Sequence, residues 1–162
     1  MHAANAPSAL HVAAVAVLII RDGRVLAMRR AATKDAGAGL WEAVSGRLTP
    51  DEDPLDGARR EVAEETGLQV RIEPRPWTAY AARRNREPML LVTYRAAWIS
   101  GEVRISDEHD AFAWLDADAF ARASRIAPLV RAVRSALAAS PPRSTDARSH
   151  EPGAANASPR SL

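Results

Sequence analysis

Hydrophobic side chains recur along residues 11–139 in runs and at spacings that predict alternating strands and helices. Runs rich in β-branched and aromatic residues predict strands, which cover residues 11–21, 24–30, 40–44, 77–82, 88–100 and 111–115. Asp22 and Gly23 separate the first two runs and are typical of a tight hairpin turn. Glycine and alanine dominate residues 31–39, which we expect to form a loop.

A helix is predicted between Asp53 and Gly67. Asp53 suits the N-cap, Pro54 suits the first helical position, and Gly67 supplies the left-handed residue that ends many helices. We expect a short helix after Asp116 and a longer amphipathic helix over residues 126–139. This order of strands, a central helix, further strands and a C-terminal helix predicts an α/β protein with helices on both faces of a mixed sheet.

The two ends of the chain lack this periodicity. Residues 1–10 are small and patternless, and proline, serine, arginine and alanine dominate residues 140–162. Such composition gives little apolar surface to bury, so both segments are predicted to be disordered. The sequence therefore predicts one domain over residues 11–139.

Composition narrows the classes of function. The chain has no cysteine, so disulfides and thiolate chemistry are excluded, and a cytoplasmic location is expected. The longest apolar run, residues 12–20, is too short to span a bilayer, so no membrane association is expected. The net charge of +2 does not favour nucleic acid as a partner.

Three carboxylates crowd one stripe of the predicted helix. Glu61, Glu64 and Glu65 stand at i, i+3 and i+4, where like charges repel each other and weaken an isolated helix. One interpretation is an ordinary solvated acidic face. The other is a site for a divalent cation with hard oxygen ligands, Mg²⁺ or Mn²⁺.

The surrounding residues extend this acidic stripe into a longer motif. The residues in question are Gly46, Glu52, Arg60, Glu61, Val62, Glu64, Glu65, Gly67 and Leu68. Together they match every position of the Nudix box, so the chain resembles the Nudix hydrolase superfamily of MutT-type enzymes. The resemblance implies the Nudix fold, an α/β/α sandwich with a mixed sheet. It also implies hydrolysis of a diphosphate linkage in a nucleotide substrate by water, assisted by Mg²⁺ or Mn²⁺.

The resemblance assigns roles to residues of the box. Metal ligands would be Glu61, Glu64, Glu65 and the backbone carbonyl of Ser45, and Glu64 would also orient or deprotonate the attacking water. Arg60 and Glu52 match a supporting pair that fixes the loop against the helix, while Gly46 and Gly67 are structural positions of the box. Ser45 stands where many members have glycine, which makes the loop geometry here a departure from the family pattern.

Candidates outside the box carry two interpretations each. Arg29 and Arg30 stand where MutT-type members contact phosphate, or they are a solvated strand end. Glu108 is an additional ligand or base, or a surface carboxylate. The arginine-rich residues 83–86 meet phosphate, or they form a solvated hairpin tip.

The exact substrate and the assembly stay open at this level. Residues that mark particular subfamilies are absent, so the sequence predicts a nucleoside di- or triphosphate or a nucleotide-sugar compound without choosing among them. The alternative is a nucleotide-binding sensor or interaction module without turnover. A homodimer is an assembly that the sequence allows.

Overall fold

The computed structural model describes residues 10–34 and 37–139. The predicted disordered segments, apart from Leu10, lie outside these residues. The strands, in chain order, are β1 (Val12–Arg21), β2 (Arg24–Arg30), β3 (Trp41–Glu42), β4 (Val44–Arg47), β5 (Gln69–Ile72), β6 (Thr78–Arg84), β7 (Glu87–Ser100) and β8 (His109–Leu115). The helices are α1 (Pro54–Thr66), between β4 and β5, and α2 (Ala117–Ala123) and α3 (Ala127–Ala138), which follow β8.

The described strands form one mixed sheet. Its main path runs β3-β2-β1-β7-β5, while β4 pairs with β1, β6 with β7 and β8 with β2. The central pair of β1 and β7 is parallel, and the other pairs are antiparallel. The predicted α/β fold with a mixed sheet is confirmed.

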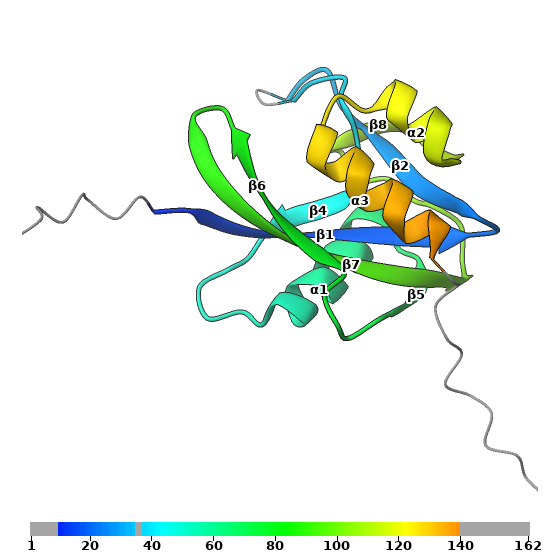
Figure 1. Ribbon diagram of the computed structural model, residues 1–162, viewed down its shortest axis with the longest axis horizontal. Helices are drawn as coiled ribbons and strands as arrows, with labels where there is room; N and C mark the ends of the chain where they lie inside the picture. Colours follow the sequence, from blue (N-terminus) through cyan, green and yellow to red (C-terminus); the bar gives the residue numbers. More distant parts are fainter. Residues whose placement is uncertain (1–9, 35–36, 140–162) are drawn as a thin grey trace, which may run out of the picture.

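Helices cover both faces of this sheet, so both sides of β1 are buried. Val15 and Val17 contribute to a hydrophobic core that includes Val62 of α1. Leu18 points the other way, into a second core with Phe120 of α2 and with α3. Figure 1 shows α1 and α3 on opposite sides of β1, so the molecule is an α/β/α sandwich.

The ends of α1 lie where the sequence predicts them. The side chain of Asp53 accepts a hydrogen bond of 2.8 Å from the backbone N–H of Leu55, and Pro54 is the first helical residue. Gly67 takes the left-handed conformation with φ 65°, and its N–H donates to the carbonyl of Ala63. These caps fix both ends of the helix and therefore the direction in which its carboxylates project.

The predicted strand over residues 40–44 is wrong in one respect. The structure splits it into β3, which pairs with β2, and β4, which pairs with β1. The chain changes partner at Ala43, which is buried. This switch carries Ser45 and Gly46 onto β1 and toward α1.

The late strands are longer than predicted. The turn between β6 and β7 is only Asn85 and Arg86, with Asn85 at φ 53°, instead of residues 83–87. Strand β8 begins at His109 instead of residue 111, because His109 pairs with Arg30 through a bulge. No helix in residues 10–34 and 37–139 is long and apolar enough to cross a membrane.

Candidate active site

Helix α1 and strand β4 face each other across an acidic cavity of about 440 Å³. Residues that line it include Ser45, Glu61, Glu64, Glu65, Arg84 and Glu108. The structure thus brings together the predicted box carboxylates and Glu108, although Glu108 is far from them in the sequence. Arg84, at the end of β6, adds a positive charge to the same cavity.

Glu65 is the most buried of these carboxylates, with 5% of the residue exposed. Its Oε2 accepts a hydrogen bond of 3.2 Å from the backbone N–H of Ser45. Burial raises the pKa of Glu65 to about 8, and the hydrogen bond from Ser45 opposes this only in part. A buried carboxyl group with this pKa is stabilised in its ionised form by a cation placed beside it.

Glu61 packs directly on the backbone of Gly46. A Cβ at position 46 would overlap with the carboxyl group of Glu61, so only glycine leaves room for it. Arg60 Nη1 donates to Glu61 Oε1 at 2.6 Å. Burial raises the pKa of Glu61, while the neighbouring Arg60 acts in the opposite direction.

Arg60 and Glu52 form the supporting pair that the box implies. Arg60 donates twice to Glu52, from Nε to Oε1 at 2.8 Å and from Nη2 to Oε2 at 2.9 Å. Nη2 also donates to the carbonyl of Arg47, which ties the loop after β4 to the helix. The hydrogen bond from Arg60, helped by the backbone N–H of Thr49, lowers the pKa of Glu52 to about 2.

Glu64 is the exposed member of the acidic stripe, with 59% of its side chain accessible. Arg60 Nη1 lies 3.4 Å from Glu64 Oε2 as well as beside Glu61. Among the described residues no three Asp, Glu or His side chains already surround a common point. The carboxylates that meet at the cavity nonetheless offer oxygen atoms as metal ligands, and such ligands suit Mg²⁺ or Mn²⁺. The raised pKa of Glu65 also fits a cation there.

The two arginines at the end of β2 differ sharply. Arg29 is 43% exposed at its side chain, and its Nε donates to Asp110 at 2.6 Å. Arg30 is 8% exposed at its side chain, and its Nη1 lies 3.3 Å from both Glu42 Oε1 and Glu108 Oε2. Arg30 is therefore committed to two carboxylates rather than standing at a solvated strand end.

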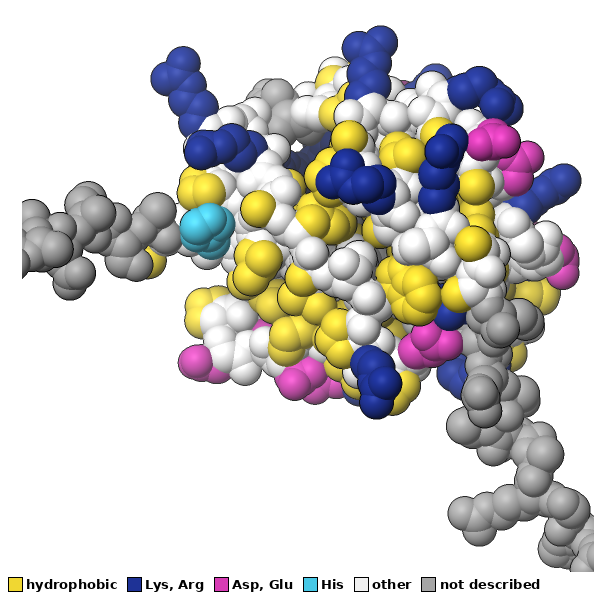
Figure 2. Space-filling model, in the orientation of Figure 1, with side chains coloured by type: hydrophobic (Ala, Val, Ile, Leu, Met, Phe, Trp, Pro, Cys, Tyr) yellow, Lys and Arg dark blue, Asp and Glu magenta, His cyan; other side chains and the backbone are white. Residues whose placement is uncertain are grey.

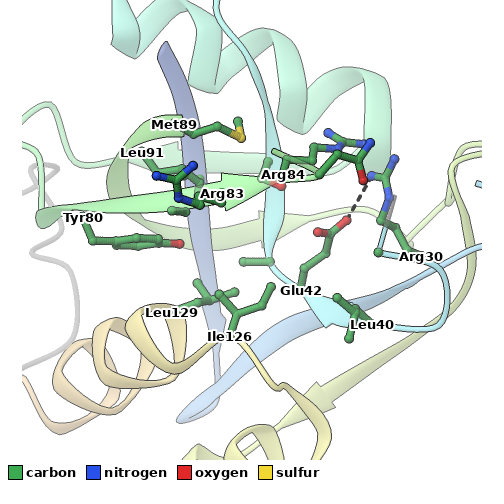
Figure 3. A pocket seen from close by; sticks show the side chains of 16 residues that line it. Arg30, Leu40, Glu42, Tyr80, Arg83, Arg84, Met89, Leu91, Ile126 and Leu129 are labelled. Carbon is green, nitrogen blue, oxygen red and sulfur yellow. Dashed lines mark hydrogen bonds and ion pairs between the residues drawn. The ribbon is translucent and has the colours of Figure 1, made fainter. Parts of the chain in front are cut away.

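A second cavity of about 230 Å³ adjoins the acidic one, and Ser45 and Arg84 line both. Figure 3 shows its walls, where apolar side chains from β7 and α3 face the ring of Tyr80. Tyr80 comes from β6, whose alternate residues Tyr80, Ala82 and Arg84 line the cavity. The site is therefore a charged compartment beside an apolar one.

A model of the NUDIX domain matches residues 9–134 of the chain. The protein belongs to the NUDIX family. It is 39% identical to a MutT-like protein of Streptomyces ambofaciens over 67% of this chain and 66% of that protein, so it spans just under two thirds of that relative. It is 34% identical to the CTP pyrophosphohydrolase of Escherichia coli over 62% of this chain and 72% of that protein.

A solved structure has the same fold. The MutT protein of Methanosarcina mazei superposes with a TM-score of 0.71 at 21% identity, covering 82% of this chain and 96% of that one. At this identity the likeness shows the fold alone. Ser45, the residue that departs from the family pattern, donates a hydrogen bond from its backbone N–H to Glu65 Oε2.

Sequence reasoning missed Glu42 in this NUDIX domain. Glu42 lies on the short strand β3 with its side chain 15% exposed, and it contacts Arg30 and His109. The available signal was a carboxylate between Trp41 and Ala43 in a predicted strand. A buried carboxylate requires a charged or hydrogen-bonding partner, so this position indicated an interaction that the sequence alone did not name. Which residues would be the partners depends on the bulge in β8, which the sequence does not reveal.

Proposed function

We propose that this NUDIX protein hydrolyses a diphosphate linkage in a nucleoside di- or triphosphate or a related nucleotide, with Mg²⁺ or Mn²⁺ as cofactor. The observation that carries the proposal is the acidic cavity in which Glu61, Glu64 and Glu65 meet Glu108 beside an apolar compartment. The E. coli relative, a CTP pyrophosphohydrolase by name, supports a nucleotide substrate.

The carboxylates have separate tasks in this proposal. Glu61, Glu64, Glu65 and the carbonyl of Ser45 would hold the cation. When bound, such a cation lowers the pKa of water and neutralises charge on the diphosphate. Arg60 keeps Glu61 in position through its hydrogen bond of 2.6 Å.

Glu64 is the residue we assign to the attacking water. It is the most exposed of the three box carboxylates, so a water molecule reaches it without displacing a neighbour. The water oxygen forms a bond to phosphorus and one proton of the water passes to Glu64. The bridging P–O bond breaks, and its electron pair leaves on the oxygen of the departing phosphate group. Glu108, held by Arg30 at 3.3 Å, faces the same cavity and assists in orienting the water.

Arg84 would neutralise the phosphates. It lines both cavities, so it lies at the junction that a diphosphate crosses when its nucleoside occupies the apolar compartment. A guanidinium group is well suited to phosphate because it presents paired N–H donors. This assigns one member of the arginine-rich hairpin to the substrate.

The test is product release from nucleoside triphosphates, ADP-ribose, nucleotide sugars and dinucleoside polyphosphates, with Mg²⁺, Mn²⁺ or chelator. The parent is compared with Glu64→Gln and with Glu102→Gln, an exposed carboxylate away from the cavity, as control. We expect the first variant to lose about 100-fold or more in kcat and the control to keep it. Metal-dependent binding of nucleotides without turnover of any of them would favour the sensor instead, and light scattering of the same samples tests the homodimer.

A further inference from the structure

The apolar cavity is lined mainly by aliphatic side chains and by one aromatic ring. Its walls include Leu40, Met89, Leu91, Ile126 and Leu129, and the ring of Tyr80 lies among them. Pockets of this kind bind an apolar or aromatic group and use few polar atoms to fix its orientation. The polar atoms on its wall therefore decide which ring is accepted.

Glu42 is the carboxylate on this wall. Its Oε1 accepts from Arg30 Nη1 at 3.3 Å and lies 3.3 Å from His109 Nε2. The side chain of His109 is fully buried, and its Nδ1 has no hydrogen-bond partner among the described residues. Because a carboxylate oxygen only accepts, His109 donates from a protonated Nε2 to Glu42, so two donors hold the same oxygen.

The other oxygen of Glu42 is left for a ligand. No hydrogen bond to Oε2 occurs within residues 10–34 and 37–139. Figure 3 shows the side chain directed toward Arg30, with this second oxygen on the side of the cavity. A carboxylate oxygen only accepts hydrogen bonds, so it binds an N–H group and repels a carbonyl oxygen.

We infer that Glu42 selects nucleotides whose base carries an exocyclic amino group, as cytosine and adenine do, over bases with a carbonyl in that place. This inference rests on the proposed function for the identity of the ligand as a nucleotide. An amino group donates to Glu42 Oε2. In uracil or hypoxanthine a carbonyl oxygen stands at the equivalent ring position, so the exocyclic group no longer donates to Glu42 and two acceptor oxygens face each other.

The first experiment varies only the substrate. CTP is compared with UTP, and ATP with ITP, because each pair exchanges one amino group for one carbonyl oxygen, together with the proton that the adjacent ring nitrogen gains. We expect kcat/KM to favour the amino-bearing member of at least one pair by about 10- to 100-fold, the usual value of a hydrogen bond to a charged group. Equal turnover within both pairs, or preference for the carbonyl-bearing member, would overturn the inference.

The second experiment changes the residue. Glu42→Gln offers both an acceptor and a donor, so the ratio within the preferred pair should fall toward one through loss on the amino side and gain on the carbonyl side. Asp118→Asn, an exposed carboxylate of α2, is the matched control and should keep the parental ratio. An unchanged ratio in a folded Glu42→Gln protein would contradict the assignment to this residue.

Binding measurements separate this inference from the proposed function. Calorimetry with CMP, UMP, AMP and IMP requires no turnover. Absence of hydrolysis together with tighter binding of CMP than UMP, or of AMP than IMP, would reject the hydrolase and keep the role of Glu42. Hydrolysis without any preference in turnover or binding would do the reverse. Where Glu42→Gln fails to fold, these ligand pairs on the parent still decide the outcome.

Discussion

The carboxyl group of Glu61 lies against the backbone of Gly46, in the space that a Cβ at position 46 would occupy. The contact joins β4 to α1 at the edge of the acidic cavity. Since the overlapping atoms are the far end of a flexible side chain, a larger residue at position 46 displaces Glu61 without breaking the core. The glycine is therefore required by the site more than by the fold.

Gly46→Ala should separate stability from activity. We expect the free energy of unfolding to change by less than about 1 kcal/mol, while metal affinity and kcat/KM fall about 10- to 100-fold because Glu61 is displaced. Denaturant unfolding and Mn²⁺ titration measure the two effects, with Glu61→Gln as the reference for loss of the ligand. If the variant unfolds, and metal affinity and kcat/KM are lost with the fold, the glycine serves the fold instead.

The ion pair between Glu52 and Arg60 makes the stability of the folded protein depend on pH. Arg60 lowers the pKa of Glu52 to about 2, below its ordinary value of 4.5. A lowered pKa in the folded state means that the stabilisation is present above about pH 4.5 and is lost as the pH falls toward 2. Glu52→Gln should remove this part of the dependence. Thermal unfolding between pH 2 and pH 6 measures it, and parallel curves for parent and variant would contradict the prediction.

Arg29 and Arg30 should respond differently to replacement by alanine. Arg29→Ala removes an exposed ion pair with Asp110, and we expect a loss below about 1 kcal/mol. Arg30→Ala leaves Glu42 without its compensating charge, so we expect the free energy of unfolding to fall by about 2–4 kcal/mol. This loss is smaller than for a fully buried pair because Glu108, the second partner of Arg30, is 44% exposed. Denaturant unfolding compares them directly.

A double-mutant cycle distinguishes the two roles of Arg30. If Arg30 acts by holding Glu108, its removal should cost little further activity in a Glu108→Gln background. If it contacts phosphate, the losses in kcat/KM should add. Strict additivity would therefore return Arg30 to the role of a phosphate ligand.

Metal binding should release a proton near neutral pH. The pKa of Glu65 is about 8, so this carboxyl group is mostly protonated at pH 7 until a cation arrives. We expect about one proton released per cation at pH 7 and almost none at pH 9, where Glu65 is already ionised. Calorimetry in buffers of different ionisation enthalpy measures the number, with Glu65→Gln as control. Equal heats in all buffers at pH 7 would contradict the prediction.

The sequence predicted best where a single residue type has a strong local effect. Asp53 and Gly67 mark the ends of α1, and Asp22 and Gly23 form the hairpin turn with φ 49° and 71°. These effects act over a few residues and need no knowledge of the rest of the chain. The acidic stripe follows from them because helical spacing fixes which side chains share a face.

Features that depend on pairing between distant strands could not be predicted in this way. The bulge that shifts the register after Arg29 brings His109 beside Arg30 and Glu42, yet residues 108–110 resemble a polar loop. The assigned roles of Glu61, Glu64, Glu65 and Glu108 stay predictions until the variants above are measured.

The parallel pairing of β1 with β7 also sets the order in which the protein can be completed during synthesis. The register joins Val12 to Met89 and Ile20 to Ala97. In a nascent chain, β1 cannot complete its pairing with β7 until residue 97 has left the ribosome. Until then the apolar side chains of β1 lack this neighbouring strand. The long separation between the two strands in the sequence therefore delays the formation of the central pair of the sheet.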